Sequence, residues 1–324
     1  MGDPSRIGEA RRHGTRLAHE LGLDETETGR LALVVTELST NLLRHAFDGR
    51  LLIAARPERR DVELIAIDRG PGIADLGRCL GDGYSTGGTP GTGLGAIRRL
   101  ASDFDVHTAM GQGTIVLARI RAKAAPACPP HGICGAAISL RAPGENVCGD
   151  VWAMAFDGAR ASVLVADGLG HGPAASDAAR AALGVYVRQP FRSPREFILE
   201  AHAALRGTRG AAVAMLLLDS SSNELRCAGA GNILGRLVSG STERAIATQH
   251  GTLGLTLRTP DEPVLAWPMH ALLLLHSDGV ESRWQTERVV SAMRMDPAIP
   301  AAMLIRDHCR GRDDATVAVL RRKD

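Results

Sequence analysis

The sequence lacks a dominant charge, since its 38 Lys and Arg residues nearly balance 36 Asp and Glu residues. A balanced chain has no long-range field for nucleic acid or an anionic membrane, so neither partner is expected. The purely apolar runs, residues 271–275 among them, are far too short to span a bilayer. The 6 cysteines form no CxxC pair and follow no secretory leader. We therefore expect a cytoplasmic protein with reduced thiols rather than a disulfide scaffold.

The length of the chain favours two domains. With 324 residues it is long for one domain and large enough for two, each with its own core. Residues 122–131, AKAAPACPPH, carry three prolines among small residues and show no apolar periodicity. This composition is typical of a semi-rigid linker. We predict one domain over residues 1–121 and a second over 132–324.

Two helices are expected at the start of the first domain. Ser5 is the predicted N-cap of the first helix, and Asp24 with Glu27 forms a predicted capping box for the second. The second helix has one apolar face, formed by Leu31, Val34, Val35, Leu38 and Leu42. Glu37 and Asn41 lie beside it, four residues apart, so both can reach one bound group. Two solvated polar residues are the alternative interpretation.

A carboxylate and several glycines follow. The run 62–67 predicts a strand that ends in Asp68, which offers an acceptor for an amino group. The glycines at 70 and 72 allow the backbone to approach a ligand closely. The glycine-rich segment 84–95 then leads into a helix, and exposed amides at such a junction favour phosphates. Each of these signals is weak when taken alone.

Taken in order, these segments resemble the motifs of the GHKL ATPase family. ELSTN (Glu37 to Asn41) is similar to its N box, DRGPG (Asp68 to Gly72) to its G1 box and GTGLG (Gly91 to Gly95) to its G2 box. Within that family the chain most resembles the RsbT-like serine kinases that control bacterial sigma factors. The resemblance covers residues 5–120. These kinases normally begin with a strand, for which the residues before Ser5 are too few.

The resemblance implies a site for ATP and Mg²⁺. It assigns Asn41 to Mg²⁺, Asp68 to the adenine amino group, and Glu37 to the role of catalytic base on an incoming hydroxyl. The other nucleotide-binding residues that it implies are Gly70, Gly72, Gly91, Gly93, Gly95 and Thr114. A nucleotide-binding shell that transfers no phosphate is the alternative.

From residue 133 onward, segments typical of strands predominate. The tight turn signal at 157–158 and a looser one at 219–223 predict antiparallel hairpins. We expect two sheets packed face to face with helices outside. The expected strands are 133–140, 151–156, 161–167, 211–219, 225–228, 233–239 and 271–277, and the expected helices are 173–187, 194–205, 286–293 and 299–308.

Acidic residues stand at the mouths of several of these segments. Asp167 ends an apolar run, and the backbone turns after it on two glycines before Pro173 begins a helix. Similar settings hold Asp150, Asp278 and the pair Asp313-Asp314. Carboxylates brought together in this way raise one another's pKa unless divalent cations neutralise them. The pattern predicts a two-metal hydrolase centre.

The motifs around these carboxylates resemble those of 2C-type metal-dependent protein phosphatases. They are VCGDVW, ADGLGHG, RGAAVAMLLLD, GAGN, HSDGV and RDDATVAVLR. The similarity is greatest to the SpoIIE-like, RsbX-like branch and covers residues 132–321. The ligands that it implies for two Mn²⁺ or Mg²⁺ ions are Asp150 and the Gly168 carbonyl on one side, Asp278 and Asp313 on the other, and Asp167 bridging both. Asp314 stays an alternative to Asp313, and the same oxygen ligands suit either ion.

The residues also bear on the mechanism. Two hard cations about 3.5–4 Å apart lower the pKa of a bridging water and clamp phosphoryl oxygens, so Asp167 and Asp278 are the expected catalytic ligands. A thiol phosphatase is the competing chemistry. Cys134 and Cys148 have no phosphate-loop context, which argues against it.

The fold expected from both resemblances is α+β. A GHKL α/β sandwich, with helices on one face of a mixed sheet, precedes a 2C-type phosphatase sandwich with α-β-β-α layers. The implied function is a bifunctional switch that phosphorylates and dephosphorylates a STAS-domain regulator on serine or threonine. The kinases that the chain resembles commonly pair, so a homodimer is compatible with it. In the alternative, the first domain only binds ATP and sequesters a sigma factor or STAS protein.

Overall fold

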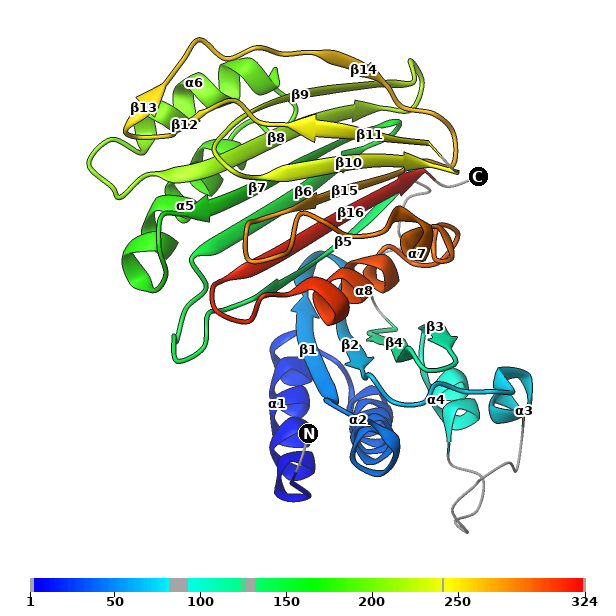
Figure 1. Cartoon of the computed structure of the whole chain (residues 1–324). Coiled ribbons are helices and arrows are strands. Elements are labelled where there is room, and N and C mark those ends of the chain that lie inside the picture. Colours follow the sequence, from blue (N-terminus) through cyan, green and yellow to red (C-terminus); the bar gives the residue numbers. More distant parts are fainter. Residues whose placement is uncertain (1–2, 82–92, 124, 126–131, 241, 323–324) are drawn as a thin grey trace. The chain divides into compact units, whose positions relative to one another are not determined.

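The computed structural model describes residues 3–81, 93–123, 125, 132–240 and 242–322. The chain divides into two compact units, Met1–Pro129 and Pro130–Asp324, whose elements are labelled in Figure 1. Residues 124 and 126–131 of the predicted linker lie outside the described residues.

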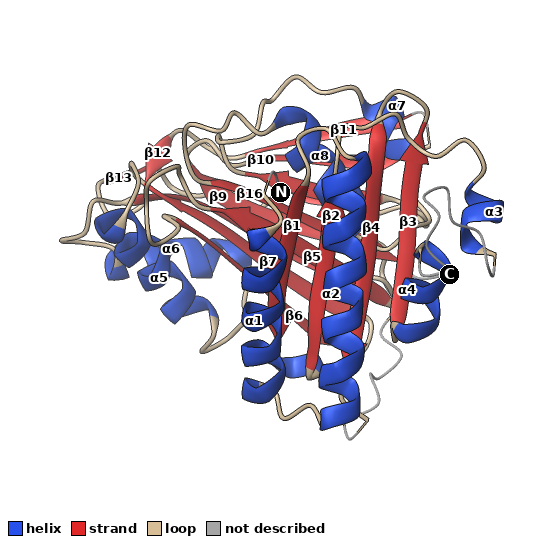
Figure 2. Ribbon diagram, turned by 90° about the horizontal axis from the view of Figure 1, so that it is seen from below, coloured by secondary structure: helices blue, strands red, loops and turns tan. Residues whose placement is uncertain are grey.

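The first unit has helices on one face of a four-stranded sheet. Its helices are α1 (Ser5–Glu20), α2 (Glu25–His45), α3 (Leu76–Leu80), α4 (Leu94–Leu100) and the short 3-10 helix η1 (Pro57–Arg59). Its strands are β1 (Arg50–Arg56), β2 (Asp61–Ile67), β3 (Asp103–Ala109) and β4 (Gly113–Arg121), in the spatial order β1-β2-β4-β3. Figure 2 shows α1 and α2 running across one face of this sheet. All three strand pairings are antiparallel, which corrects the expected mixed sheet.

Local sequence signals explain how the two long helices begin. The predicted capping box of α2 is confirmed: Asp24 Oδ1 accepts from the Glu27 amide and Glu27 Oε2 accepts from the Asp24 amide, both at 2.7 Å. The predicted Ser5 cap is wrong, because Ser5 is the first residue of α1 and donates its amide to Asp3 Oδ1 at 2.8 Å. The apolar face of α2 is buried in the core, at roughly 2 kcal/mol per large side chain.

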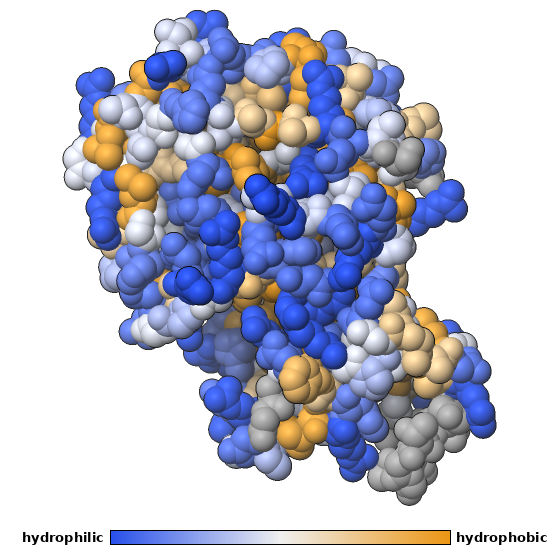
Figure 3. Space-filling view, in the orientation of Figure 1, coloured by the Kyte–Doolittle hydropathy of each residue, from blue (hydrophilic) through white to orange (hydrophobic). Residues whose placement is uncertain are grey.

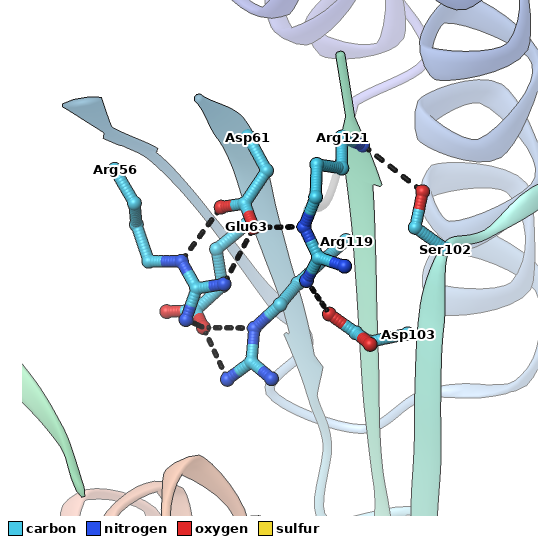
Figure 4. Close-up of polar contacts among 7 residues, drawn as sticks. All are labelled: Arg56, Asp61, Glu63, Ser102, Asp103, Arg119 and Arg121. Carbon is cyan, nitrogen blue, oxygen red and sulfur yellow. Dashed lines mark hydrogen bonds and ion pairs between the residues drawn. The ribbon is translucent and has the colours of Figure 1, made fainter. Parts of the chain in front are cut away.

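Ion pairs join the strands on the sheet face opposite α2 (Figure 4). Arg56 of β1 donates two hydrogen bonds of 2.7 Å to Asp61 of β2, and Arg119 of β4 donates to Glu63 of β2 at 2.7 Å. Arg121 of β4 lies 3.5 Å from Asp61 and also pairs with a carboxylate of β3. Val62, Leu64 and Ala66 of β2 pack in the core with the helices, so the alternate residues Asp61 and Glu63 lie on the opposite face.

The second unit contains two five-stranded sheets. One has the order β11-β10-β15-β16-β5, from β11 (Thr242–Ala247), β10 (Leu234–Ser239), β15 (Leu272–His276), β16 (Ala315–Arg322) and β5 (Ile133–Leu140). The other has the order β14-β9-β8-β7-β6, from β14 (Val264–Ala266), β9 (Glu224–Ala230), β8 (Ala211–Asp219), β7 (Arg160–Gly168) and β6 (Asp150–Asp157). Two short strands, β12 (Gly251–Thr252) and β13 (Thr256–Leu257), form a separate pair. The seven strands expected from the sequence are confirmed among these.

The two sheets pack face to face with helices outside. Val163 and Val165 of β7 face Leu273 and Leu275 of β15 in the core between the sheets. The intervening Leu164 lies in a second core, formed with α5 (Pro173–Tyr186) and α6 (Pro194–Ala204). On the other side α8 (Ala298–His308) packs against β5 and β16, and α7 (Thr286–Val290) precedes it. The α-β-β-α order confirms the fold class predicted from the sequence.

Some large apolar side chains are exposed, such as Leu33, Phe47 and Trp152. The face drawn in Figure 3 is mostly hydrophilic, with hydrophobic side chains in small separate groups. Within the described ranges, no helix combines the length and the apolar character needed to cross a membrane.

Candidate active sites

The first unit encloses a cavity of about 720 Å³ beside α2. Six of the residues expected to bind nucleotide line it: Glu37, Asn41, Asp68, Gly72, Gly93 and Thr114. Gly70 and Gly95 are not among the lining residues, and Gly91 lies outside the described residues. The sequence motifs therefore converge on one cavity from α2, from the end of β2, from the start of α4 and from the start of β4.

Asp68 organises one wall of this cavity. Its Oδ1 accepts hydrogen bonds from the amides of Gly70, at 2.7 Å, and Thr114, at 3.2 Å. The backbones also touch: Gly113 has φ +81°, and a Cβ placed on it would lie 2.0 Å from the Asp68 carbonyl oxygen. Gly70 thus helps to hold the Asp68 side chain in place through its amide. The close approach at Gly113 requires glycine at that position.

Glu37 and Asn41 line the cavity from successive turns of α2. Burial raises the pKa of Glu37, and Arg44, three residues beyond Asn41, opposes the rise. A carboxylate with a raised pKa accepts a proton more readily at neutral pH. Arg44, Arg78 and Cys79 are among the other residues of the wall, which the sequence interpretation missed. The helical spacing 37, 41, 44 is a signal that could have identified Arg44.

The second unit brings the predicted phosphatase carboxylates to one end of the sandwich. Asp150 and Asp167 are register partners on β6 and β7 of one sheet. Asp278 follows β15 by two residues and Asp313 precedes β16 by two, and these strands are neighbours in the other sheet. Each sheet therefore contributes carboxylates to the same end of the fold.

The carboxylates perturb one another strongly. Burial, and then the charges of Asp150 and Asp278, raise the pKa of Asp167 from 3.8 to about 9. Burial also raises the pKa of Asp150 to about 6, against hydrogen bonds from Ser277 and Thr316 that lower it. Carboxylic acids with pKa values this far above normal are poised to exchange protons for cations.

The donor set fits divalent cations in its chemistry. All side-chain donors are oxygens, and Asp150 Oδ1 is buried without a hydrogen-bond partner among the residues that the structure describes. Two other oxygens are turned toward protein donors: Asp278 Oδ2 accepts from Asn232 and Asp150 Oδ2 accepts from Ser277, both at 2.7 Å. In the part of the chain that the structure describes, no three acidic, His or Cys side chains are grouped so as to hold an ion. The assignment of individual ligands stays a prediction.

Asp313 and Asp314 occupy different environments. Asp313 lines an open cleft of about 440 Å³ together with Asp278. Asp314 is 2% exposed, and its Oδ1 accepts from the Ala142 amide at 2.8 Å. Asp313 thus lines the cleft, whereas Asp314 holds the chain near Ala142 through Oδ1, and its Oδ2 is buried with no hydrogen-bond partner among the described residues. The choice between them as a ligand stays a prediction.

The loop after Asp167 is fixed by close backbone packing. A Cβ on Gly168 would lie 2.0 Å from the Ala175 carbonyl oxygen, so α5 begins directly against this glycine. His171 Nδ1 lies 2.6 Å from Glu145 Oε1, which ties the same loop to the chain that precedes β6. His171 thus orients the loop, and the sequence interpretation had missed Glu145.

The polar residues that hold the carboxylates were also missed. Ser277 Oγ donates to Asp150 and accepts from the Thr316 amide at 2.9 Å, and Asn232 holds Asp278. Asn232 belongs to the GAGN motif and Ser277 directly precedes Asp278. The motifs were therefore visible in the sequence, but their contacts depend on pairing between distant strands.

A thiol nucleophile is disfavoured by the structure. Burial, and then the Asp150 charge, raise the pKa of Cys148 to about 12. This thiol is protonated at neutral pH, and the thiolate is the nucleophilic form.

The raised carboxylate pKa values predict a pH-dependent stability. The folded pKa of Asp167, about 9, lies above its ordinary 3.8, so folding favours the protonated form. Stability of the metal-free protein should then fall as pH rises from 3.8 toward about 9. We expect a lower melting temperature in chelator at about pH 8.5 than at about pH 6, and Mn²⁺ should reduce the difference. An equal pH slope in the Asp167→Asn variant would assign the effect to other groups.

Each of the two units matches a known protein family. Residues 2–120 match the histidine kinase-like ATPase domain, and residues 157–323 match Stage II sporulation protein E (SpoIIE). The serine/threonine-protein kinase RsbT of Bacillus subtilis (strain 168) is 34% identical over 114 residues, which are 35% of this chain and 86% of RsbT.

Two solved structures are similar over the larger part of the chain. One, described as "The bacterial stressosome: a modular system that has been adapted to control secondary messenger signaling", has 25% identity and a TM-score of 0.55, over 58% of this chain and 99% of its own. The crystal structure of RsbX in complex with magnesium has 19% identity and a TM-score of 0.53, over 59% of this chain and 96% of its own. The likeness to RsbX is one of fold.

Proposed function

Because the chain belongs to the SpoIIE family and carries an RsbT-type histidine kinase-like ATPase domain before it, we propose that it is a bifunctional protein switch. One unit phosphorylates serine or threonine on a regulator with ATP, and the other removes that phosphate. One observation carries the proposal: the predicted nucleotide-binding residues line one cavity in the first unit, and the predicted metal-binding carboxylates interact with one another in the second.

The phosphatase activity would depend on divalent cations. Asp150, Asp167, Asp278 and Asp313, with the Gly168 carbonyl, would hold two Mn²⁺ or Mg²⁺ ions, which supply Lewis acidity and a nucleophile for phosphoester hydrolysis. The protein's own contribution is to hold these carboxylates in place. Ser277 fixes Asp150, Asn232 fixes Asp278, and α5 fixes the loop at Gly168.

The kinase activity would use the cavity beside α2. Asn41 would bind Mg²⁺, and Asp68 with Gly72, Gly93 and Thr114 would hold ATP. Glu37, whose pKa is raised by burial, would accept the proton of the attacking hydroxyl. The 34% identity to the serine/threonine-protein kinase RsbT supports this assignment.

We assign the substrate to the STAS-domain class of regulators. The likeness to a stressosome structure at 25% identity supports a partner of that kind. Transcription under an alternative sigma factor would be one output. Opposed activities on one target would consume ATP with no net change. Partner binding or nucleotide occupancy would therefore decide which activity operates.

The test follows phosphate on a STAS-domain protein encoded near this gene, mixed with Mg·ATP. With the Asp278→Asn variant, phosphate should accumulate on the partner. With the wild-type chain it should stay low or decay, because the phosphatase removes it. Absence of phosphate in both mixtures would contradict the kinase assignment for this partner, and equal accumulation in both would contradict the phosphatase assignment.

A further inference from the structure

Two arginines line the cleft that holds Asp278 and Asp313. The cleft has a volume of about 440 Å³, and its lining residues are Asp278, Glu281, Arg310, Arg312 and Asp313. The carboxylates suit cations, but the guanidinium groups do not. The two arginines therefore require an explanation other than cation binding.

Backbone pairing fixes the arginines relative to the carboxylates. Val280 and Cys309 form an antiparallel bridge between the chain after β15 and the chain before β16. On either side of it, the Arg310 amide donates to the Gly279 carbonyl and the Glu281 amide to the His308 carbonyl, both at 2.9 Å. Because Gly279 directly follows Asp278, this pairing sets Arg310 beside the carboxylate. Arg312 directly precedes Asp313.

The guanidinium groups are available to a ligand. Arg310 and Arg312 are both exposed, and their side chains make no hydrogen bond or ion pair with any residue that the structure describes. The third acidic side chain of the cleft, Glu281, lies instead 3.4 Å from His308 Nδ1. Arginines beside carboxylates normally pair with them when the geometry allows. Here the guanidinium groups of Arg310 and Arg312 line an open cleft instead.

From these contacts we propose that Arg310 and Arg312 bind the phosphate of the phosphoserine or phosphothreonine substrate in this cleft. The proposal rests on the phosphatase function proposed above. Guanidinium forks match phosphate oxygens in bidentate geometry. The negative charge of a bound phosphate would also reduce the repulsion between the arginines and any cations that the carboxylates hold.

The first test measures binding of inorganic phosphate to the full chain by calorimetry, with Mn²⁺ and a saturating non-hydrolysable ATP analogue to occupy the other cavity. Arg310→Ala and Arg312→Ala should each weaken phosphate binding roughly tenfold, and the double variant should weaken it more than either single variant. Arg312→Lys, which keeps the charge and loses the fork, should fall between Arg312→Ala and wild type.

The matched control is Arg160→Ala. Arg160 is half-exposed on β7, seven residues from Asp167, or about 23 Å at the rise of an extended strand. The Arg160→Ala variant should bind phosphate with the same affinity as wild type. The Mn²⁺ affinity of the arginine variants should not fall, because they remove positive charge from the cleft.

The outcomes separate the two proposals. Phosphate binding unchanged in the double variant, or undetectable in wild type, overturns the arginine assignment. A parallel loss of Mn²⁺ affinity also overturns it, since the arginines would then act through the carboxylates. If wild type binds phosphate and the double variant does not, the arginine assignment stands. This holds even when wild type fails to hydrolyse p-nitrophenyl phosphate. That failure would instead overturn the proposed phosphatase function.

Discussion

We expect the Asp167→Asn variant to lose phosphoserine hydrolysis by on the order of 10³-fold or more in kcat while it still binds ATP. The charges of Asp150, Asp278 and Asp313 all raise the pKa of Asp167, so Asp167 lies close to each of the other proposed ligands. Removing its charge should therefore disturb both proposed cation sites. ATP binding is unchanged because the nucleotide cavity is built from residues of the first unit.

The same substitution should stabilise the metal-free protein. Asparagine keeps the shape of the side chain but removes one buried charge from a repelling cluster, so the melting temperature in chelator at alkaline pH should exceed that of wild type. Asp157→Asn, at the opposite end of β6, is the matched control and should retain activity. Full hydrolysis by the Asp167→Asn variant would refute the cation assignment, and loss of ATP binding would refute the independence of the two sites.

Glu37→Gln should reduce phosphate transfer to the partner by about 10²- to 10⁴-fold, the usual contribution of a general base. The substitution is nearly isosteric, so ATP affinity should change little. Burial raises the pKa of the Glu37 carboxylate, so the wild-type side chain is a stronger base than an exposed glutamate.

This variant also decides between the kinase and the sequestration hypotheses. Radiolabelled ATP gives the transfer rate, and calorimetry gives the affinity for nucleotide and partner. If the first unit is a kinase, the variant forms the complex and transfers no phosphate. If it only sequesters a sigma factor or STAS protein, the variant keeps full activity in cells. Glu25→Gln, an exposed change in the first turn of α2, should behave as wild type in both assays.

Features set by local sequence were predictable. The capping box at Asp24 and the apolar stripe of α2 depend on residues three or four positions apart, so the sequence determines them directly. The Ser5 cap was wrong because Ser5 is already the first residue of α1, where its own amide donates to Asp3 Oδ1. Short-range patterns therefore identify a helix but leave its first residue uncertain by a few positions.

Contacts between distant strands were not predictable. The acidic motifs indicated carboxylates at strand ends, but nothing in the sequence showed that Ser277 would hold Asp150 across the sandwich. Arg310 enters the cleft only because Cys309 pairs with Val280, 29 residues earlier in the chain. The mixed sheet expected from resemblance was wrong for the same reason: strand direction is a property of pairing, not of the strand's own residues.

The distribution of carboxylates over both sheets has a consequence for the lifetime of the folded protein. Asp150 and Asp167 belong to one sheet, while Asp278 and Asp313 flank strands of the other. Cations shared between them would cross-link the two layers, much as a disulfide would, but reversibly. The layers could then separate only after the ions dissociate. Metal starvation would thus shorten the life of the phosphatase unit as well as stop its catalysis, and proteolysis would remove it fastest when it is least able to act.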